Sequence, residues 1–201
     1  MSAPPLELGE ERQSQSTNAY IEESRMPKLP SRVMIFGCSG TGKSTLARAI
    51  KAQTTLPVIH LDKEYWQPGW VETEKSEWIQ RVEKLVRAPS WVMDGGYAST
   101  FDLRIPRTEM IIWLDYPRWQ ALLGIFRRWW RYRGTVDRPD IGPGCPEKMD
   151  WEFFMFVWTY KTKQHADLEE SLLKFGYEGE LIKARSRRDL SRQLKPYGLK
   201  V

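Results

Sequence analysis

The stretch RVMIFGCSGTGKSTLARAI, residues 32–50, decides the fold. It opens with a short apolar run that contains β-branched residues and ends in a glycine, which is typical of a buried strand. Residues 37–44 match the phosphate-binding pattern G-x-x-x-x-G-K-[ST] in full, and the apolar positions after Lys43 follow a helical spacing. Strand, glycine-rich loop and helix therefore occur in the order that a phosphate-binding loop requires.

The residue types of this loop indicate its chemistry. Glycines allow successive backbone amides to turn toward phosphate oxygens, and the N-terminus of the following helix adds a partial positive charge. We expect Lys43 to contact the terminal phosphates and Ser44 to ligate Mg²⁺. The loop alone predicts binding of a nucleotide, whereas transfer of a phosphate requires further groups.

Three aspartates at the ends of apolar runs are candidates for those groups. Asp94 in WVMDGGY is the best Mg²⁺ candidate, because the glycine pair after it leaves space for phosphate. Asp62, at the end of the run PVIHLD, is expected near the acceptor, where it could accept a hydroxyl proton or orient the acceptor group. Asp115 precedes Tyr-Pro and is expected to cap the next helix. Each carboxylate taken alone could equally belong to a loop or a cap.

An arginine-rich stretch, RRWWRYRGTVDRPD at residues 127–140, is the second informative feature. Phosphoryl transfer is catalysed largely by positioning and by cations around the migrating group. The stretch therefore predicts a lid that closes over phosphates. A solvated basic helix face explains some of its arginines equally well, and the interleaved aromatic rings also fit nucleic-acid binding. Its arginines are Arg127, Arg128, Arg131, Arg133 and Arg138.

The aromatic residues and histidines divide into expected core and expected site. Trp66 and Trp70, in the polar run DKEYWQPGW, are candidates for the wall of an acceptor pocket. His60 and His165 are expected to be packed or superficial and not ligands, since no metal-ligand spacing exists. Core packing is the expectation for Trp91, Trp113, Trp151 and Trp158.

Composition sets the class of the protein. The 201 residues suit one α/β domain, and a formal net charge of +5 favours an anionic partner. Two cysteines favour a reducing cytoplasm, and no apolar run approaches the roughly 18 residues that cross a bilayer. We expect residues 1–30 to be a disordered tail, with a native start at Met26 as one hypothesis, and residues 31–201 to form the domain.

Strands alternate with helices along this domain. After residues 32–37, the runs PVIHLD, WVMD, MIIWLD and GELIKA read as four more strands. Helices are expected between them, including one after Pro117, a long one after residue 150 and a last one opened by Ser186 with Asp189. This alternation predicts a mainly parallel sheet covered on both faces.

Residues 32–194 resemble the small P-loop kinases related to adenylate kinase, and most closely the topology modulation protein, or FlaR-type, group. The resemblance is carried by GCSGTGKST, PVIHLD, YWQPGW, WVMDGGY, DLRIPR, LDYPRW, RYRG, RPDIGPGCPE and DWEFFMFVW, in that order. It implies a three-layer fold of the nucleoside-monophosphate-kinase type, with a five-stranded parallel sheet in the order 2-3-1-4-5 and an arginine-rich lid near residues 128–148. The implied activity is ATP- and Mg²⁺-dependent phosphorylation of a small acceptor.

The resemblance also implies roles for residues. Asp94 would be the Mg²⁺-associated aspartate together with Ser44, and Arg128 would lie near the transferred phosphate. The ATP-binding residues would be Gly37, Cys38, Ser39, Gly40, Thr41, Gly42, Lys43, Ser44 and Thr45. The acceptor would meet Asp62, Tyr65, Trp66, Trp70, Gly95, Tyr97 and Arg104. Two positions depart from the group: Gly124 stands where an arginine is expected, and Gly96 where asparagine is common.

The leading interpretation is thus a cytoplasmic kinase, a monomer or homodimer, in which Lys43, Asp62, Arg128, Arg131 and Arg138 carry the chemistry. An alternative is an ATP-binding regulatory protein associated with nucleic acid and influencing DNA topology, in which ATP switches the lid. A nucleotide sensor without catalysis would leave Asp94 and the lid arginines without a role. No sequence feature indicates a membrane partner.

Overall fold

The structure of the protein is a computed structural model that describes residues 27–133, 139–146 and 151–201. The expected tail up to residue 26 and Arg138 of the expected lid lie outside the described residues. Among the helices described, none combines the length and the apolar character needed to cross a membrane.

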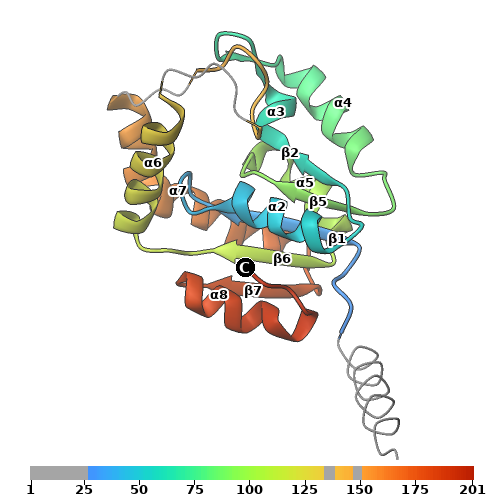
Figure 1. The fold of residues 1–201 in the computed structure, drawn as a ribbon. Helices are drawn as coiled ribbons and strands as arrows, with labels where there is room; N and C mark the ends of the chain where they lie inside the picture. The colour runs from blue at the N-terminus through green and yellow to red at the C-terminus, as the bar shows by residue number, and fades with distance from the viewer. Residues whose placement is uncertain (1–26, 134–138, 147–150) are drawn as a thin grey trace, which may run out of the picture.

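A five-stranded sheet forms the centre of the molecule (Figure 1). All its neighbouring strands are parallel, and their order is β2-β5-β1-β6-β7. Counted along the chain within this sheet, the order is 2-3-1-4-5, as predicted. The strands are β1 (Arg32–Gly37), β2 (Val58–His60), β5 (Trp91–Asp94), β6 (Met110–Leu114) and β7 (Glu180–Ala184).

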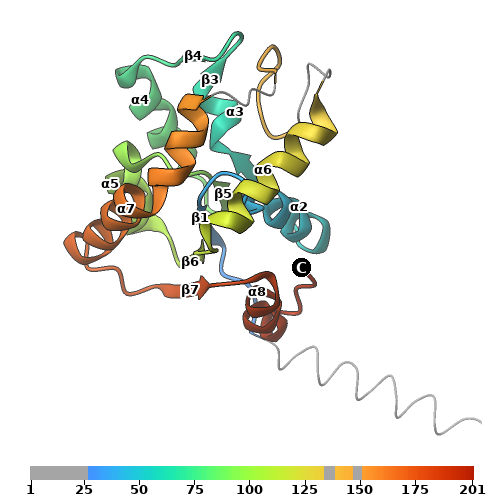
Figure 2. The ribbon, with the colours of Figure 1, turned by 90° about the vertical axis from the view of Figure 1, so that its left-hand side faces the viewer.

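Helices cover both faces of this sheet, which explains why its central strands are continuous apolar runs (Figure 2). Side chains of one face, such as Val33 and Ile35, pack with helices α2 (Lys43–Gln53) and α8 (Arg187–Leu194). Side chains of the other face pack with α4 (Lys75–Leu85), α5 (Phe101–Arg104) and α7 (Trp151–Lys174). The result is a three-layer α/β fold.

The remaining elements surround the carboxyl ends of the strands, where ligands bind in open parallel sheets. They comprise α3, α6 and a two-stranded antiparallel hairpin of β3 and β4. Short 3-10 turns complete the chain. The bounds are α3 (Leu61–Tyr65), β3 (Trp66–Gln67), β4 (Val71–Glu72), η1 (Ala98–Thr100), η2 (Ile105–Arg107), α6 (Arg118–Tyr132) and η3 (Lys195–Tyr197).

Two expectations about aspartates are corrected by the structure. Strand β2 ends at His60, so Asp62 lies in the first turn of α3, where an acidic residue suits the positive end of a helix. Asp115 is not the N-cap of α6, because the capping residue is Pro117. Asp115 instead lies 3.8 Å from the Nδ1 atom of His165 on α7.

The expected tryptophan core is only half right. Trp91 and Trp113 are buried in the sheet, but Trp151 and Trp158 on α7 are largely exposed. Helix α7 turns a different stripe, with Val157, Tyr160 and Leu168, toward the sheet.

Candidate functional site

The phosphate-binding loop follows β1 and is organised around one carbonyl oxygen. The backbone oxygen of Cys38 accepts hydrogen bonds from the Thr41 hydroxyl at 2.7 Å, the Thr41 amide at 3.3 Å and Lys43 Nζ at 3.2 Å. Gly42 ends the loop in a left-handed conformation (φ +97°), which glycine adopts readily, and caps helix α2. The loop thus takes its shape from its own residues, and Lys43 folds over it.

Helix α6 lies directly against this loop, backbone to backbone. A Cβ atom on Gly40 would come within 2.2 Å of the Ala121 carbonyl oxygen, and one on Gly124 within 1.9 Å of the Gly40 carbonyl oxygen. No side chain therefore fits at position 124. The presence of Gly124, where the sequence resemblance leads one to expect an arginine, has this steric reason.

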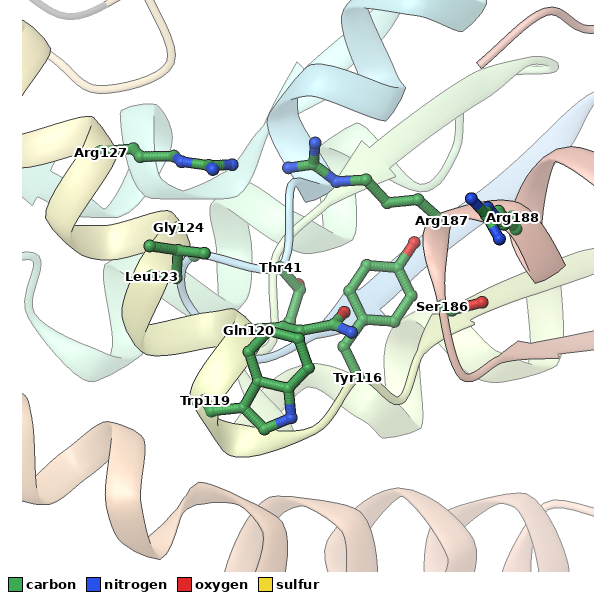
Figure 3. A pocket seen from close by; sticks show the side chains of 11 residues that line it. Thr41, Tyr116, Trp119, Gln120, Leu123, Gly124, Arg127, Ser186, Arg187 and Arg188 are labelled. Atoms are coloured by element: carbon green, nitrogen blue, oxygen red, sulfur yellow. The ribbon is translucent and has the colours of Figure 1, made fainter.

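The arginines of α6 are distributed over several contacts. Arg128 donates from Nη1 to the Ser39 hydroxyl of the phosphate-binding loop at 3.2 Å. Arg131 is exposed, and Arg133 stacks on the ring of Trp130 at 3.5 Å from its centroid. Through this hydrogen bond Arg128 contacts the loop, while Arg127 points into an adjoining cavity (Figure 3).

That cavity, of about 320 Å³, opens beside the loop between α6 and the start of α8. In Figure 3, Arg127 and Arg187 extend toward each other from opposite sides, and the rings of Trp119 and Tyr116 lie below them. Trp119 is 62% exposed. An aromatic ring and cations beside a phosphate-binding loop suit a nucleotide base and its phosphates. Tyr116, Trp119 and Arg187 were not predicted from the sequence, because no motif marks them.

Asp94, the predicted metal residue, is the last residue of β5 and lies beside His60, the last residue of β2. The two are partners in the parallel register, and Asp94 Oδ2 lies 2.9 Å from His60 Nδ1. Asp94 is 4% exposed, and its buried Oδ1 has no hydrogen-bond partner among the described residues. The sequence predicted a packed or superficial His60 and did not indicate this contact.

These residues fit a magnesium ion. Mg²⁺ prefers oxygen ligands and is usually held by one or two carboxylates together with substrate phosphates. The buried Oδ1 of Asp94 and the hydroxyl of Ser44, at the start of α2, are donors of this kind. Within the described part of the chain no larger cluster of His, Cys, Asp and Glu is present, and Mg²⁺ on a nucleotide does not need one.

Asp62, a predicted acceptor residue, is in contact with Tyr97, another of them. Its Oδ1 accepts a hydrogen bond of 2.7 Å from the hydroxyl of Tyr97. Burial, and then the charge of Asp62, raises the pKa of Tyr97 well above its ordinary value, so the phenol remains a donor at neutral pH. The rings of Tyr65, Trp78 and Tyr97 lie with centroids 4.8 to 5.1 Å apart and form one wall of a cavity of about 410 Å³.

Arg104, predicted to contact the acceptor, lies inside the protein and bonds the loop after β5. It is fully buried, and its guanidinium donates to the carbonyl oxygens of Gly95 at 3.2 Å, Gly96, and Tyr97 at 2.9 Å. Its Nε donates to the Thr100 hydroxyl at 3.1 Å. Burial lowers the pKa of Arg104 to about 9, so it is still charged at neutral pH. Arg104 therefore holds the loop after β5 in place.

Replacing Arg104 by methionine is expected to lower the free energy of unfolding by about 3 kcal/mol, because several buried carbonyl groups would lose their donors. Arg107→Met is the control, since Arg107 is exposed three residues further on, and a change within about 0.5 kcal/mol is expected there. Urea unfolding followed by circular dichroism measures both. Equal stability of the two variants would contradict the positioning role.

The part of the predicted lid at residues 144–146 contacts the hairpin of β3 and β4. The amide of Gly69 donates to the Gly144 carbonyl at 2.8 Å, and Trp70 Nε1 donates to the Pro146 carbonyl at 2.9 Å. Trp66 packs against Trp70 with ring centroids 5.4 Å apart. Trp70 therefore joins this part of the predicted lid to the hairpin, and Trp66 continues the aromatic wall toward Tyr65.

A five-stranded parallel sheet in this order, with the pattern G-x-x-x-x-G-K-[ST] between β1 and α2, defines an α/β fold of the P-loop type. No family model matches the chain, and no curated protein gives a significant match. Solved structures with a similar course of the backbone do exist.

A gluconokinase from Sinorhizobium meliloti 1021 is 16% identical, with a TM-score of 0.48 over 85% of this chain and 91% of that one. A shikimate kinase from Bacteroides thetaiotaomicron is 18% identical, with a TM-score of 0.44 over 84% and 98% of the two chains. A deoxyadenosine kinase from M. mycoides with bound dCTP is 12% identical, with a TM-score of 0.43 over 83% and 98%. The likeness concerns the fold.

Proposed function

We propose that the protein is an ATP- and Mg²⁺-dependent phosphotransferase that moves the γ-phosphate of ATP to a small acceptor, as its sequence resemblance to topology modulation protein and other adenylate-kinase-related kinases implies. The observation that carries this proposal is the buried Oδ1 of Asp94, which has no hydrogen-bond partner among the described residues. Asp94 ends the strand next to the one that leads into the phosphate-binding loop. A protein that only held a nucleotide by its loop would not need that carboxylate.

The roles of the chain's residues follow from their chemistry. Lys43 and the loop amides neutralise the phosphates, and Arg128, with Arg131 and Arg138, stabilises charge on the migrating group. The acceptor hydroxyl oxygen bonds to the γ-phosphorus, the bond from that phosphorus to the bridging oxygen of ADP breaks, and the hydroxyl proton passes to Asp62. Bound Mg²⁺ would supply Lewis-acid neutralisation of the phosphate oxygens.

A screen for transfer tests this proposal. The protein would be incubated with ATP and Mg²⁺ against nucleoside monophosphates, nucleosides, sugars and other hydroxyl compounds, and products identified by mass spectrometry. A phosphorylated acceptor that forms only when both ATP and Mg²⁺ are present is the expected result. Hydrolysis of ATP alone across a broad panel would contradict the proposal.

The cavity beside the loop supports a prediction about the nucleotide base. We propose that the base stacks on Trp119, because the position that an arginine would take in related kinases is closed at Gly124. Trp119→Ala is expected to raise the KM for ATP about tenfold with kcat nearly unchanged, since one base stack contributes about 1–3 kcal/mol. Steady-state kinetics measure this, with Trp130→Ala as the control on the same helix. Equal KM values in the two variants would contradict it.

One observation favours the alternative of a regulatory protein associated with nucleic acid. Helix α6 has an exposed apolar stripe bordered by arginines, a pattern suited to stacking bases and binding a phosphate backbone. The stripe consists of Trp119, Leu123, Phe126 and Trp130. Binding of single-stranded oligonucleotides that weakens steeply with salt would support this alternative, and no binding at low ionic strength would remove it.

We also propose a cytoplasmic location and a monomeric or homodimeric state. In support of the first, no disulfide joins the two buried cysteines, Cys38 and Cys145. Analytical ultracentrifugation would test the second.

A further inference from the structure

We infer that His60 is a positioning residue for Asp94, and that its hydrogen bond directs the second carboxylate oxygen toward the cation that accompanies the nucleotide. This inference rests on the proposed function and goes beyond it by naming a residue that no motif of the loop contains. It starts from the two side chains that close neighbouring strands of the sheet.

The contact is built into the sheet. His60 and Asp94 occupy the same level of the parallel pair β2 and β5, and each is the last residue of its strand. Neighbouring residues on one face of a sheet point the same way, so the two side chains meet without any loop to place them. The backbone positions behind the 2.9 Å contact between Nδ1 and Oδ2 are therefore fixed by the sheet.

The burial of the pair gives the contact its effect. The side chains of His60 and Asp94 are 14% and 5% exposed. A carboxylate that keeps one oxygen on a fixed donor cannot turn freely about its last torsion, so the other oxygen keeps one direction. In Asp94 that other oxygen is the buried Oδ1, which lacks a partner among the residues that the structure describes.

A buried oxygen without a partner costs free energy unless a ligand satisfies it. A hard cation is the ligand that fits a carboxylate oxygen beside a phosphate-binding loop. Groups that hold a metal ligand in orientation typically change metal affinity or activity by about 10- to 100-fold when they are removed. His60 is thus expected to contribute to the use of Mg²⁺ and not to the binding of the nucleotide itself.

The tautomer follows from the partner. A carboxylate accepts hydrogen bonds only, so Nδ1 of His60 must carry the proton in this contact. This makes a pair of substitutions informative. The amide nitrogen of asparagine can occupy nearly the place of Nδ1, whereas that of glutamine corresponds to the more distant Nε2. Asn is therefore the variant that can keep the donor, and Gln and Ala are variants that lose it.

The test measures the affinity for a non-hydrolysable ATP analogue by isothermal titration calorimetry over a series of Mg²⁺ concentrations. It compares the unaltered full chain with His60→Asn, His60→Gln and His60→Ala. The Ala and Gln variants are expected to need about tenfold more Mg²⁺ for the same nucleotide affinity, with affinity in EDTA unchanged. The Asn variant is expected to remain within about threefold of the unaltered protein.

Two outcomes would overturn the inference. One is a loss of nucleotide affinity in EDTA as well as in Mg²⁺, which would make His60 a packing residue. Thermal unfolding in EDTA would then show a lower midpoint for the variant. The other is a Mg²⁺ dependence that is equal in all four proteins. The failure of the proposed function is distinguishable, because an absence of phosphate transfer by the unaltered protein leaves this titration able to decide the role of His60.

Discussion

Lys43→Ala is expected to lower kcat for phosphate transfer by about 10³-fold and to leave the fold intact. Lys43 is at the first position of α2, and its ammonium group lies over the loop with Nζ 3.2 Å from the Cys38 carbonyl. Because that carbonyl also accepts from Thr41, loss of the lysine removes one of three contacts and does not open the loop. It does remove a cation from the place where negative charge moves during the reaction, and one such group contributes about 10²- to 10³-fold or more.

The control for this variant lies on the same helix. Lys51→Ala removes an equal charge from the last turn of α2, where the side chain is exposed. Near-normal kcat and a small loss of stability, a few tenths of a kcal/mol, are expected there. Single-turnover kinetics separate binding from transfer, and a melting curve checks the fold. Transfer by Lys43→Ala at the rate of Lys51→Ala would contradict both the role of Lys43 and the proposed phosphotransferase.

The strands of the sheet were predictable because each is marked by the residues of its own segment. RVMIF, WVMD and MIIWL are short apolar runs ended by glycine or aspartate, and both faces of the sheet need such runs. The order of the strands came from the resemblance, since no local pattern contains it. Hairpin β3–β4 was missed because its strands have two residues each and turn through Gly69 and Trp70, both with positive φ. No hydrophobic period can mark so short an element.

The candidate site was predictable where one residue type has one use. The glycine loop with Lys43 is of this kind, whereas Asp94 could be singled out only by the glycine pair that follows it. His60 and Arg104 are not, because their roles depend on which atoms the fold brings near them. His60 contacts Asp94 because the register of their strands places them side by side. Arg104 bonds three carbonyl groups in residues 95–97, the loop that precedes its own helix α5. Histidine and arginine are common in many settings, so the sequence does not distinguish these roles.

Gly124 lies inside helix α6, where a glycine normally lowers the stability of the helix. Alanine in a helix interior is favoured over glycine by about 1 kcal/mol, so Gly124→Ala would ordinarily stabilise α6. In this fold the added methyl group would lie 1.9 Å from the Gly40 carbonyl oxygen, and that oxygen belongs to backbone that cannot rotate away. Overpacking of this kind costs about 1–3 kcal/mol and sometimes more. The clash outweighs the gain in helix propensity.

Gly124→Ala is therefore expected to lower the free energy of unfolding by about 2 kcal/mol and to weaken the binding of an ATP analogue about tenfold, because the loop must shift to admit the methyl group. Denaturant unfolding and calorimetry measure the two effects. Gly96→Ala is the matched control: the nearest atoms to its Cβ lie 3.9 Å away, which is ordinary contact, so both quantities should stay close to those of the unaltered protein. A Gly124→Ala protein that is more stable and binds the analogue normally would mean that α6 does not rest on the loop in solution. The base would then have room for a contact at position 124, and the role proposed for Trp119 would lose its steric argument.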